Sequence, residues 1–400
     1  MSNLIEPIEY ICEKFGPRIA GSEADLKTCD YIKEKFKTYS PNVETETFSV
    51  VGRALQNLIL FLVWGYFVSV IGYFFLAPLA LALAILMLLI YYFARFKNRN
   101  LINLLVKKSE TRNIIATFQP SKQPTKVIIF TGHHDSAFHM PLFERKLKQI
   151  ALIQNCAIYG IVLLVVASIW KTIYFIPQIS PPLFMFSYDL GALTVAWYIL
   201  PDVVFFLSLV GLGFGFFFMK KMVTKTPLLG ANDNLTSVSM LFALGEYLKS
   251  NPPRNIEVKL ISFGAEEPGL VGSKHYVDKR INELKNVVNI NFETLGSGSL
   301  GFILKEKDNN ITHDEEFVEH LVGLAKKHGF DFPAKKIHYG NTDAGSFTKR
   351  GIPATTLFAF GKDDVFDLWH STEDIPENLN EELLHEAYEF IIKIIEEYDK

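Results

Sequence analysis

The segment from Ala54 to Ala94 contains no Asp, Glu, Lys or Arg. An uncharged, apolar stretch of this length is long enough for two membrane-spanning helices of about 20 residues each. The break between them falls near Leu76-Ala-Pro78. The segment therefore predicts a tight helical hairpin in a lipid bilayer, with helices at about Leu55–Phe75 and Pro78–Phe93.

A second apolar block follows further along the chain. Gln149–Trp170 is uncharged and predicts one span, whereas Leu190–Met219 is interrupted by Pro201-Asp202. We expect an interfacial segment and then a span at about Val203–Met219, and a continuous tilted helix is the alternative. Asp202 is expected to cap this last helix at the far interface, the alternative being an intramembrane functional group. Close helix packing is expected at Gly211, Gly213 and Gly215.

The distribution of basic residues predicts how the chain is oriented. Both apolar blocks interrupt one polar sequence, so each block should cross the bilayer an even number of times, which gives four spans. The far-side loops carry only Lys171. By the positive-inside rule we expect a multi-pass integral membrane protein whose polar domain and termini face the cytoplasm. The basic residues that flank the spans are Arg53, Arg95, Lys97, Arg99, Lys107, Lys108, Arg145, Lys146, Lys148, Lys220, Lys221 and Lys225.

Composition agrees with this division. The 400 residues have a formal net charge of −3 and 49% hydrophobic content, so no excess of basic charge calls for nucleic acid as a partner. Met1–Tyr39 lacks the basic-then-apolar pattern of a signal peptide. The cysteines Cys12, Cys29 and Cys156 form no disulfide framework, which fits a reducing compartment. The oligomeric state stays open.

The polar part of the chain alternates strand-like and helix-like segments. This alternation predicts an α/β fold with a mostly parallel mixed sheet and helices on both faces. One domain is expected from residues 1–50, 101–145 and 222–400, with a transmembrane hairpin at 54–96 and a second transmembrane block at 149–219. Strands are expected at Thr45–Val50, Ile114–Phe118, Lys126–Thr131, Glu257–Gly264, Val287–Phe292 and Thr355–Phe360, and helices at Asp25–Tyr39, Asn234–Ser250, Glu315–His328 and Glu381–Tyr398.

Two adjacent glutamates, Glu266 and Glu267, follow an apolar run and precede glycines. A carboxylate pair at a strand end suits a site where one oxygen donor holds a metal ion and its neighbour takes a proton from metal-bound water. A solvated turn is the alternative, since Glu is normally exposed.

Further metal-binding residue types stand beside strand-like segments or glycines. They are His133, Asp233, Glu293 and His370. Carboxylate oxygens mixed with imidazole suit Zn²⁺ or a similar divalent ion, and the absence of Cys from these motifs argues against a purely structural zinc site. Sites on parallel sheets gather beyond the carboxyl ends of the strands, where His133, Glu266, Glu267 and Glu293 all fall.

An ordered series of motifs resembles the dizinc exopeptidase family, which includes bacterial leucyl aminopeptidases, glutamate carboxypeptidase and glutaminyl cyclase. Any one motif could arise by chance, but the ordered set is a strong signal. The motifs are Gly16-Pro-Arg-Ile-Ala-Gly-Ser22, Gly132-His-His-Asp-Ser136, Gly230-Ala-Asn-Asp-Asn234, Phe263-Gly-Ala-Glu-Glu267, Ile290-Asn-Phe-Glu293, Gly351-Ile-Pro-Ala354 and His370-Ser-Thr-Glu-Asp374.

The resemblance implies a role for each candidate site residue. His133 and Glu293 would hold one zinc, Glu267 and His370 the other, and Asp233 would bridge the two Zn²⁺ ions. Glu266 would be the general base. Asp135 would accept the other N–H of His133 and fix its tautomer. A cis peptide bond is implied between Asp233 and Asn234.

Four further residues in or near these motifs are considered for the site. His134 and His139 are expected to be neighbours of the site, since the motif already uses His133. Asp343 matches an aspartate that the family usually follows with His, but here Ala344 follows, which removes any contact from that histidine. Tyr339 is a candidate for stabilising the oxyanion, with a surface tyrosine as the alternative.

The function expected from the resemblance is that of a membrane-embedded metallo-exopeptidase, an aminopeptidase that hydrolyses the first residue of short peptides. The alternatives are a glutaminyl cyclase-like acyltransferase, a carboxypeptidase, an amidase for lipid-linked amino acids, and a catalytically silent scaffold. The expected partners are a peptide substrate and the lipid bilayer, with no nucleic acid.

Overall fold

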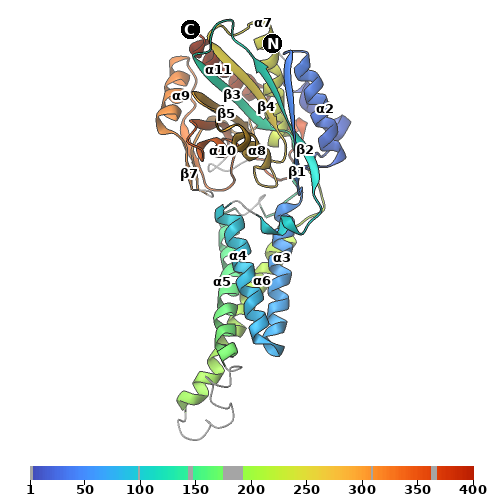
Figure 1. The fold of residues 1–400 in the computed structure, drawn as a ribbon, viewed down its shortest axis with the longest axis vertical. Coiled ribbons are helices and arrows are strands. Elements are labelled where there is room, and N and C mark those ends of the chain that lie inside the picture. Colours follow the sequence, from blue (N-terminus) through green and yellow to red (C-terminus); the bar gives the residue numbers. More distant parts are fainter. Residues whose placement is uncertain (1–2, 98–99, 143–146, 174–191, 308–309, 362–366) are drawn as a thin grey trace. The chain divides into compact units, whose positions relative to one another are not determined.

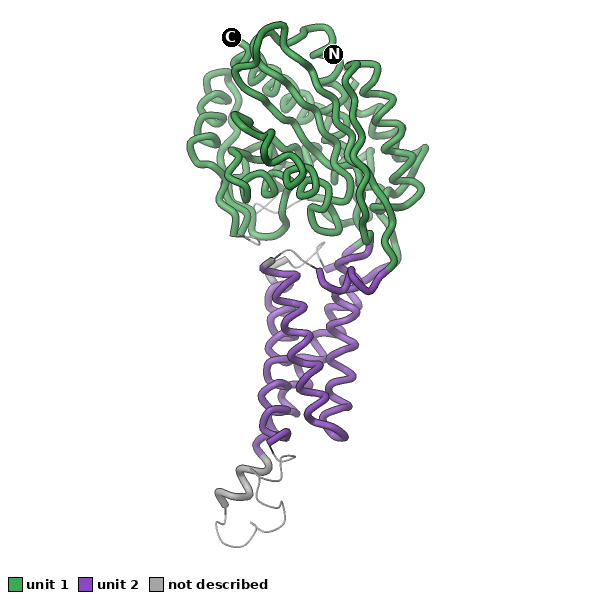
Figure 2. The backbone as a smooth tube through the Cα atoms, in the orientation of Figure 1, with its two compact units in different colours: residues 1–52, 107–139, 225–400 green, residues 53–106, 140–224 purple. Residues whose placement is uncertain are grey.

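The computed structural model describes residues 3–97, 100–142, 147–173, 192–307, 310–361 and 367–400. The chain divides into two units, coloured green and purple in Figure 2. The first, called here the sheet unit, comprises Met1–Gly52, Lys107–His139 and Lys225–Lys400. The second, the helical unit, comprises Arg53–Val106 and Met140–Thr224. Leu190, where the last apolar segment was expected to start, lies outside the described residues.

The sheet unit is built on a mixed sheet, whose strands are drawn as arrows in Figure 1. The strand order is β1-β2-β4-β3-β5-β9-β6-β7, with β8 paired to β6. Its centre is parallel, because β4, β3, β5 and β9 run in the same direction. Antiparallel pairings flank this centre on both sides. The mixed α/β class is thereby confirmed. The strands are β1 (Asn42–Val50), β2 (Ser109–Phe118), β3 (Lys126–His133), β4 (Ile256–Phe263), β5 (Val287–Glu293), β6 (Ser299–Glu306), β7 (Ile311–Thr312), β8 (Ala334–Ile337) and β9 (Ala354–Phe360).

Both faces of the sheet are covered, which explains why the central strands read as continuous apolar runs. On β3, Ile128 and Phe130 belong to a large core on one face, and Ile129 belongs to a smaller core on the other. Successive side chains of a strand point to opposite faces, so an apolar run serves both cores. The large core is closed by α1 (Glu6–Phe15), α2 (Glu23–Lys37), α7 (Thr236–Ser250), α9 (Glu315–Lys327) and α11 (Glu381–Tyr398), and the small core by α8 (Val271–Arg280) and α10 (Ala344–Thr348).

The helical unit contains the apolar helices. They are α3 (Ala54–Phe75), α4 (Ala77–Lys97), α5 (Leu147–Ile173) and α6 (Ala192–Met222), with a short 3-10 turn, η1 (Leu101–Leu104), after α4. Four stretches of these helices are long and apolar enough to cross a membrane: Ala54–Phe75, Ala77–Phe96, Gln149–Ile173 and Leu200–Met222. The chain turns between α3 and α4 at Leu76, where the break was expected.

The expected break at Pro201 was wrong, because α6 continues through this proline. Asp202 also does not cap the helix, since α6 begins at Ala192. Its carboxylate instead accepts a hydrogen bond from the Tyr73 hydroxyl at 2.8 Å and pairs with the Lys171 ammonium at 3.0 Å. The negative charge of the Asp202 carboxylate is therefore compensated by these two partners within the helical unit.

Helices α5 and α6 approach closely at a pair of glycines. A Cβ atom added to Gly211 would lie 2.5 Å from the Cα of Gly160, which no real contact permits. Gly213, by contrast, has nothing within 4 Å of such an atom, and the nearest atom at Gly215 is 3.7 Å away. Of the three glycines expected to allow close packing, Gly211 is the one where any larger residue would collide with the neighbouring helix.

Candidate active site

The candidate site lies where the central parallel strands end. His133 is the last residue of β3, and Glu293 is the last residue of β5. Glu266 and Glu267 lie in the turn that follows β4. Because parallel strands present their carboxyl ends at one edge, three separate stretches of sequence meet there. Asp233 comes from the irregular turn η2 (Ala231–Leu235) before α7, and His370 comes from the loop after β9.

Gly230 lets the chain enter the turn that carries Asp233. Its φ is +61°, a left-handed conformation that costs glycine little. A Cβ atom there would also lie 2.5 Å from the carbonyl oxygen of Asp233. The peptide bond between Asp233 and Asn234 is cis, as the resemblance implied.

One group of three side chains forms around His133. Its Nε2 atom lies 3.2 Å from Asp233 Oδ1 and 3.1 Å from Glu293 Oε1. All three residues are buried. One imidazole nitrogen and two carboxylate oxygens at this spacing can converge on a single divalent ion.

A second group forms around His370 and shares Asp233 with the first. The Nε2 atom of His370 lies 3.2 Å from Glu267 Oε2 and 3.6 Å from Asp233 Oδ2. The other oxygen of Glu267, Oε1, is buried and has no hydrogen-bond partner within the described residues. The two oxygens of Asp233 therefore face different groups, as a carboxylate that bridges two ions must do.

Glu266 lies beside these groups without belonging to either. Its Oε2 is 3.9 Å from His133 Nε2, which is farther than any carboxylate oxygen that joins the first group. Its side chain is 13% exposed, so it is reached from solvent more easily than Glu293, at 6%. This position leaves the Glu266 carboxylate free to exchange protons with a molecule at the site.

Asp135 connects the two strand ends that supply most of the site. Its carboxylate accepts the backbone N–H groups of Glu266 at 3.0 Å and Glu267 at 3.2 Å. The Nδ1 atom of His133 lies 3.1 Å from the main-chain oxygen of Asp135 and 3.5 Å from its carboxylate. The expected contact to the carboxylate is thus the longer of the two, and the main-chain oxygen shares in orienting the imidazole.

Arg18 and Asp374 hold the surrounding loops, and neither was given a role from the sequence. The guanidinium of Arg18 is fully buried and donates to the carbonyl oxygens of Gly16, His134, Leu229 and Gly230. The carboxylate of Asp374 accepts the backbone N–H groups of Asn232 at 2.5 Å and Asp233 at 3.2 Å. Both residues stand in motifs that carried the family resemblance, which was the signal that could have found them.

The site contains more acidic than basic side chains. Burial raises the pKa of Glu293 to about 8 and that of Glu266 well above its usual range, although His133 opposes both shifts. Burial disfavours a charged His370, yet Glu267 raises the pKa of that imidazole above its ordinary value. No lysine or arginine pairs with Asp233, Glu266, Glu267 or Glu293 in the part of the chain that the structure describes. Such a cluster attracts cations.

The remaining candidates belong to neither of the two groups. His134 points to another cluster, described below, and His139 contributes its backbone N–H to the carbonyl of Thr226. Tyr339 is half-buried, and no hydrogen bond among the described residues joins it to the site. Asp343 is fully buried at the start of α10, and neither of its oxygens has a hydrogen-bond partner there.

Part of the chain matches a known protein family. Residues 217–395 match the family described as Peptidase family M28. This range includes Asp233, Glu266, Glu267, Glu293 and His370, whereas His133 and Asp135 precede it. Aminopeptidase YwaD of Bacillus subtilis (strain 168) is 33% identical over 174 residues, which are 42% of this chain and 37% of that protein. The chain thus spans well under half the length of this curated relative.

Two solved structures share the fold. A zinc aminopeptidase from Bacillus subtilis, BSAP, superimposes with a TM-score of 0.57 at 18% identity, over 99% of this chain and 94% of that one. A glutaminyl cyclase from an Acidobacteriales bacterium gives a TM-score of 0.56 at 14% identity, over 99% and 93%. At these identities the likeness shows the fold and leaves the reaction to be argued from the site.

Proposed function

Because residues 217–395 match peptidase family M28, we propose that this chain is a member of that family, a membrane-embedded zinc aminopeptidase that removes the first residue of short peptides. The observation that carries the proposal is the pair of three-residue groups that meet at Asp233. A bridging carboxylate between two imidazole-carboxylate groups is what a two-metal hydrolytic site requires.

The residues present fit two zinc ions. His133, Asp233 and Glu293 would hold one ion, and Asp233, Glu267 and His370 the other. The carboxylates of these groups and Glu266 carry four negative charges, which two divalent ions would balance. The unpartnered Oε1 atom of Glu267 is a further donor that a cation would satisfy. Each group offers three protein ligands, so each ion would keep a position open, as catalytic zinc does.

In the proposed reaction Glu266 is the residue that moves protons. When bound, the zinc pair would act as a Lewis acid on the scissile carbonyl and lower the pKa of a bound water toward about 7. Glu266 would take a proton from the attacking water as the new bond to the carbonyl carbon forms. The protonated Glu266 then gives this proton to the departing amine. Burial raises the pKa of Glu266, which makes its carboxylate a stronger base than an exposed one.

Asp343 is proposed to bind the free amino terminus of the substrate, because its charge is close enough to act on Glu266 and Glu293. Its carboxylate is fully buried, and burial raises its pKa to about 6, against the opposing charge of His133. Two zinc ions would balance the other carboxylates and leave Asp343 with its charge. A substrate ammonium group would supply both the missing positive charge and the missing hydrogen-bond donors. This favours an aminopeptidase over a carboxypeptidase, because the terminal carboxylate of a carboxypeptidase substrate would be repelled by the Asp343 carboxylate.

The helical unit is proposed to span the bilayer four times. Its four candidate spans have mean hydropathies of 2.1 to 2.3, yet only 22–33% of each is buried by protein. Large apolar side chains such as Phe74, Leu79 and Phe206 are about 60% exposed, so lipid would have to cover them. The basic residues beside the spans orient the sheet unit to the cytoplasm.

This orientation can be tested with a matched pair of cysteines. In a Cys156→Ser background, Lys171→Cys should react with a membrane-impermeant maleimide on intact cells. Lys220→Cys should react only after lysis. The reverse pattern would contradict the cytoplasmic placement.

The reaction is tested with matched peptides whose amino termini are free or acetylated, using detergent-purified protein. Release of the first residue from the free peptides only is the expected result. Cleavage of the acetylated set would support a carboxypeptidase or amidase. Cyclisation of amino-terminal glutamine without hydrolysis would support a glutaminyl cyclase, and zinc binding without turnover a silent scaffold.

A further inference from the structure

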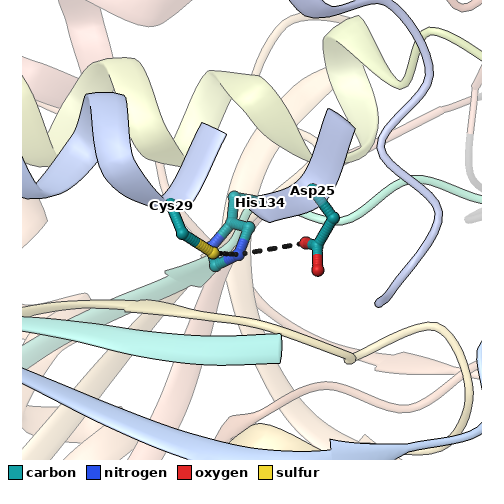
Figure 3. A group of neighbouring side chains, drawn as sticks. All are labelled: Asp25, Cys29 and His134. Atoms are coloured by element: carbon teal, nitrogen blue, oxygen red, sulfur yellow. Dashed lines mark hydrogen bonds and ion pairs between the residues drawn. The ribbon is translucent and has the colours of Figure 1, made fainter. Parts of the chain in front are cut away.

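A second cluster of metal-binding side chains lies in the sheet unit, outside the proposed peptidase site. Asp25 and Cys29 come from α2, and His134 follows β3 (Figure 3). The Sγ atom of Cys29 lies 3.2 Å from His134 Nε2, and Asp25 Oδ1 lies 3.4 Å from the same nitrogen. All three residues are completely buried.

Local sequence explains how α2 supplies two members of the cluster. Asp25 and Cys29 are four residues apart, so both side chains lie on the same face of the helix. The other oxygen of Asp25, Oδ2, accepts the backbone N–H of Gly21 at 2.8 Å, which is an ordinary contact at a helix start. That contact accounts for one oxygen and leaves Oδ1 directed at His134 without a hydrogen-bond partner in the described residues.

The hydrogen-bond pattern around His134 makes the cluster unusual. Its Nδ1 atom lies 2.8 Å from the Ser262 hydroxyl, so Nδ1–H can donate to that oxygen. The neutral imidazole then presents a lone pair on Nε2. This lone pair faces a carboxylate oxygen, which is also an acceptor, and a sulfur atom. Either a proton on Nε2 or a metal cation among the three atoms makes these contacts favourable, and the Arg112 carbonyl oxygen, 3.8 Å from Cys29 Sγ, can accept the thiol hydrogen in the protonated case.

We propose that Asp25, Cys29 and His134 form a third metal site, which holds one Zn²⁺ or similar thiophilic divalent ion. A sulfur, a nitrogen and an oxygen are all ligands that zinc accepts in proteins, and the donor atoms of this cluster lie within 4.8 Å of one another. Binding displaces the proton of the Cys29 thiol, so that sulfur coordinates as the thiolate.

The charges of the cluster favour a divalent ion. A thiolate and a carboxylate carry two negative charges, which one divalent ion neutralises in the company of a neutral imidazole. Uncompensated charge is costly in a site that water does not reach. A single proton on Nε2 is the rival occupant: it balances the Asp25 carboxylate when the Cys29 thiol keeps its own proton.

A candidate fourth ligand, the Thr111 hydroxyl, lies near His134. A Cβ atom added to Gly264 would lie 3.3 Å from His134 Nε2 and 2.6 Å from Thr111 Oγ1, so both atoms border the same point of the backbone. That hydroxyl is buried and has no hydrogen-bond partner within the described residues. Thr111 could therefore supply a fourth, oxygen ligand.

The burial of the ligands assigns the ion a structural role. Catalytic zinc keeps a position open to substrate, but every member of this cluster is inaccessible. The ion would join α2 to the end of β3 and the residues after it, a segment that includes His133 and Asp135. It would thus link Cys29 and His134, which lie far apart in the sequence. A link of this kind lowers the conformational entropy of the unfolded chain and thereby stabilises the folded state.

Cobalt substitution tests the proposal in the full-length, detergent-purified protein. A thiolate bound to Co²⁺ gives a charge-transfer band in the near ultraviolet, whereas the proposed peptidase site has no sulfur ligand and gives none. We expect this band in the wild-type protein, and we expect Cys29→Ser to lose it together with one metal equivalent per chain. Cys12→Ser and Cys156→Ser are matched controls that should keep both.

The outcomes separate this proposal from the proposed function. A band that survives in Cys29→Ser would assign the sulfur to another cysteine and overturn the site. Absence of the band from cobalt-loaded wild-type protein, with no sulfur at about 2.3 Å in the zinc X-ray absorption spectrum, would show that the cluster holds a proton instead. This second result needs no variant to fold. If the peptidase proposal fails, the sulfur signal should remain.

Discussion

Arg18 is predicted to hold the active-site loops together through its fixed set of donors. Its Nε donates to His134 at 2.7 Å, Nη1 to Leu229 at 2.6 Å and Gly16 at 3.1 Å, and Nη2 to Gly230 at 3.1 Å. All four acceptors are main-chain carbonyl oxygens. They belong to the amino-terminal segment, the loop after β3 and the turn before η2, so one side chain joins three stretches of the chain.

The substitution Arg18→Lys keeps the charge but replaces a planar fork with a single ammonium group. We expect the ammonium to reach at most two of the four carbonyls. Each lost hydrogen bond to a charged group costs about 1.5–3 kcal/mol, so the loss of two costs about 3–6 kcal/mol. This is a large fraction of the roughly 5–15 kcal/mol by which a domain is stable. Arg18→Met, which has no donor, should prevent the sheet unit from folding stably.

Native-state hydrogen exchange measures this effect within the sheet unit, independently of the helical unit. Amides of β3, β4 and β5 should lose protection by about 10²–10⁴-fold in Arg18→Lys, since each factor of ten corresponds to about 1.4 kcal/mol. Arg254→Lys, at an exposed arginine, is the control and should change protection little. Protection within threefold of wild type in Arg18→Lys would refute the argument.

Three further predictions follow from individual contacts. Gly211→Leu should destabilise the helical unit by about 1–3 kcal/mol, because its side chain would collide with Gly160, and Gly213→Leu should not; equal thermal midpoints in detergent would contradict this. Asp343→Asn should lower kcat/KM on peptides with free amino termini about 10–100-fold, through the loss of a charged hydrogen bond worth about 1.5–3 kcal/mol, and an unchanged kcat/KM would exclude contact with the ammonium group. Burial raises the pKa of Cys12 to about 11, so its thiol stays protonated at pH 8 and should react with N-ethylmaleimide far more slowly than a free thiol; mass spectrometry of the labelled peptide measures the rate, and labelling as fast as a small thiol would be inconsistent with this burial.

The local signals in the sequence were sufficient for much of the fold. Apolar runs ending at Thr131, Gly264 and Phe292 predicted β3, β4 and β5, because strands buried on both faces leave a continuous apolar trace. The turn at Leu76 was marked by the proline that follows it. These features depend on neighbouring residues, and neighbouring residues are what a single sequence displays.

Other elements could not be predicted because tertiary packing decides them. The strand β6 reads Ser299–Glu306 and carries both polar ends and a glycine, yet its pairing with β9 buries it. Helix α10, at Ala344–Thr348, is too short to show a period. In α6, Pro201 lies inside a helix that the sequence predicted to break there, because a proline in a membrane span does not by itself end the helix.

The candidate site shows the same division. The order of the motifs indicated which residues should meet, but it did not show that Asp135 bonds to the backbone of both glutamates. Nor could it show that His134 turns away from His133 toward Cys29, a residue more than 100 positions earlier. Contacts of this kind have no periodic signature and are visible only after the chain has folded.

The most direct test of the proposed site separates the base from the metal ligands. Zinc content and peptidase activity should be measured together for the wild type, Glu266→Gln and His370→Ala. We predict that Glu266→Gln keeps the wild-type zinc content and loses activity by about 10²–10⁴-fold, the usual contribution of a general base. His370→Ala should lose bound zinc as well as activity. If Glu266→Gln lost zinc to the same extent as His370→Ala, Glu266 would be a ligand and the proposed mechanism would be wrong.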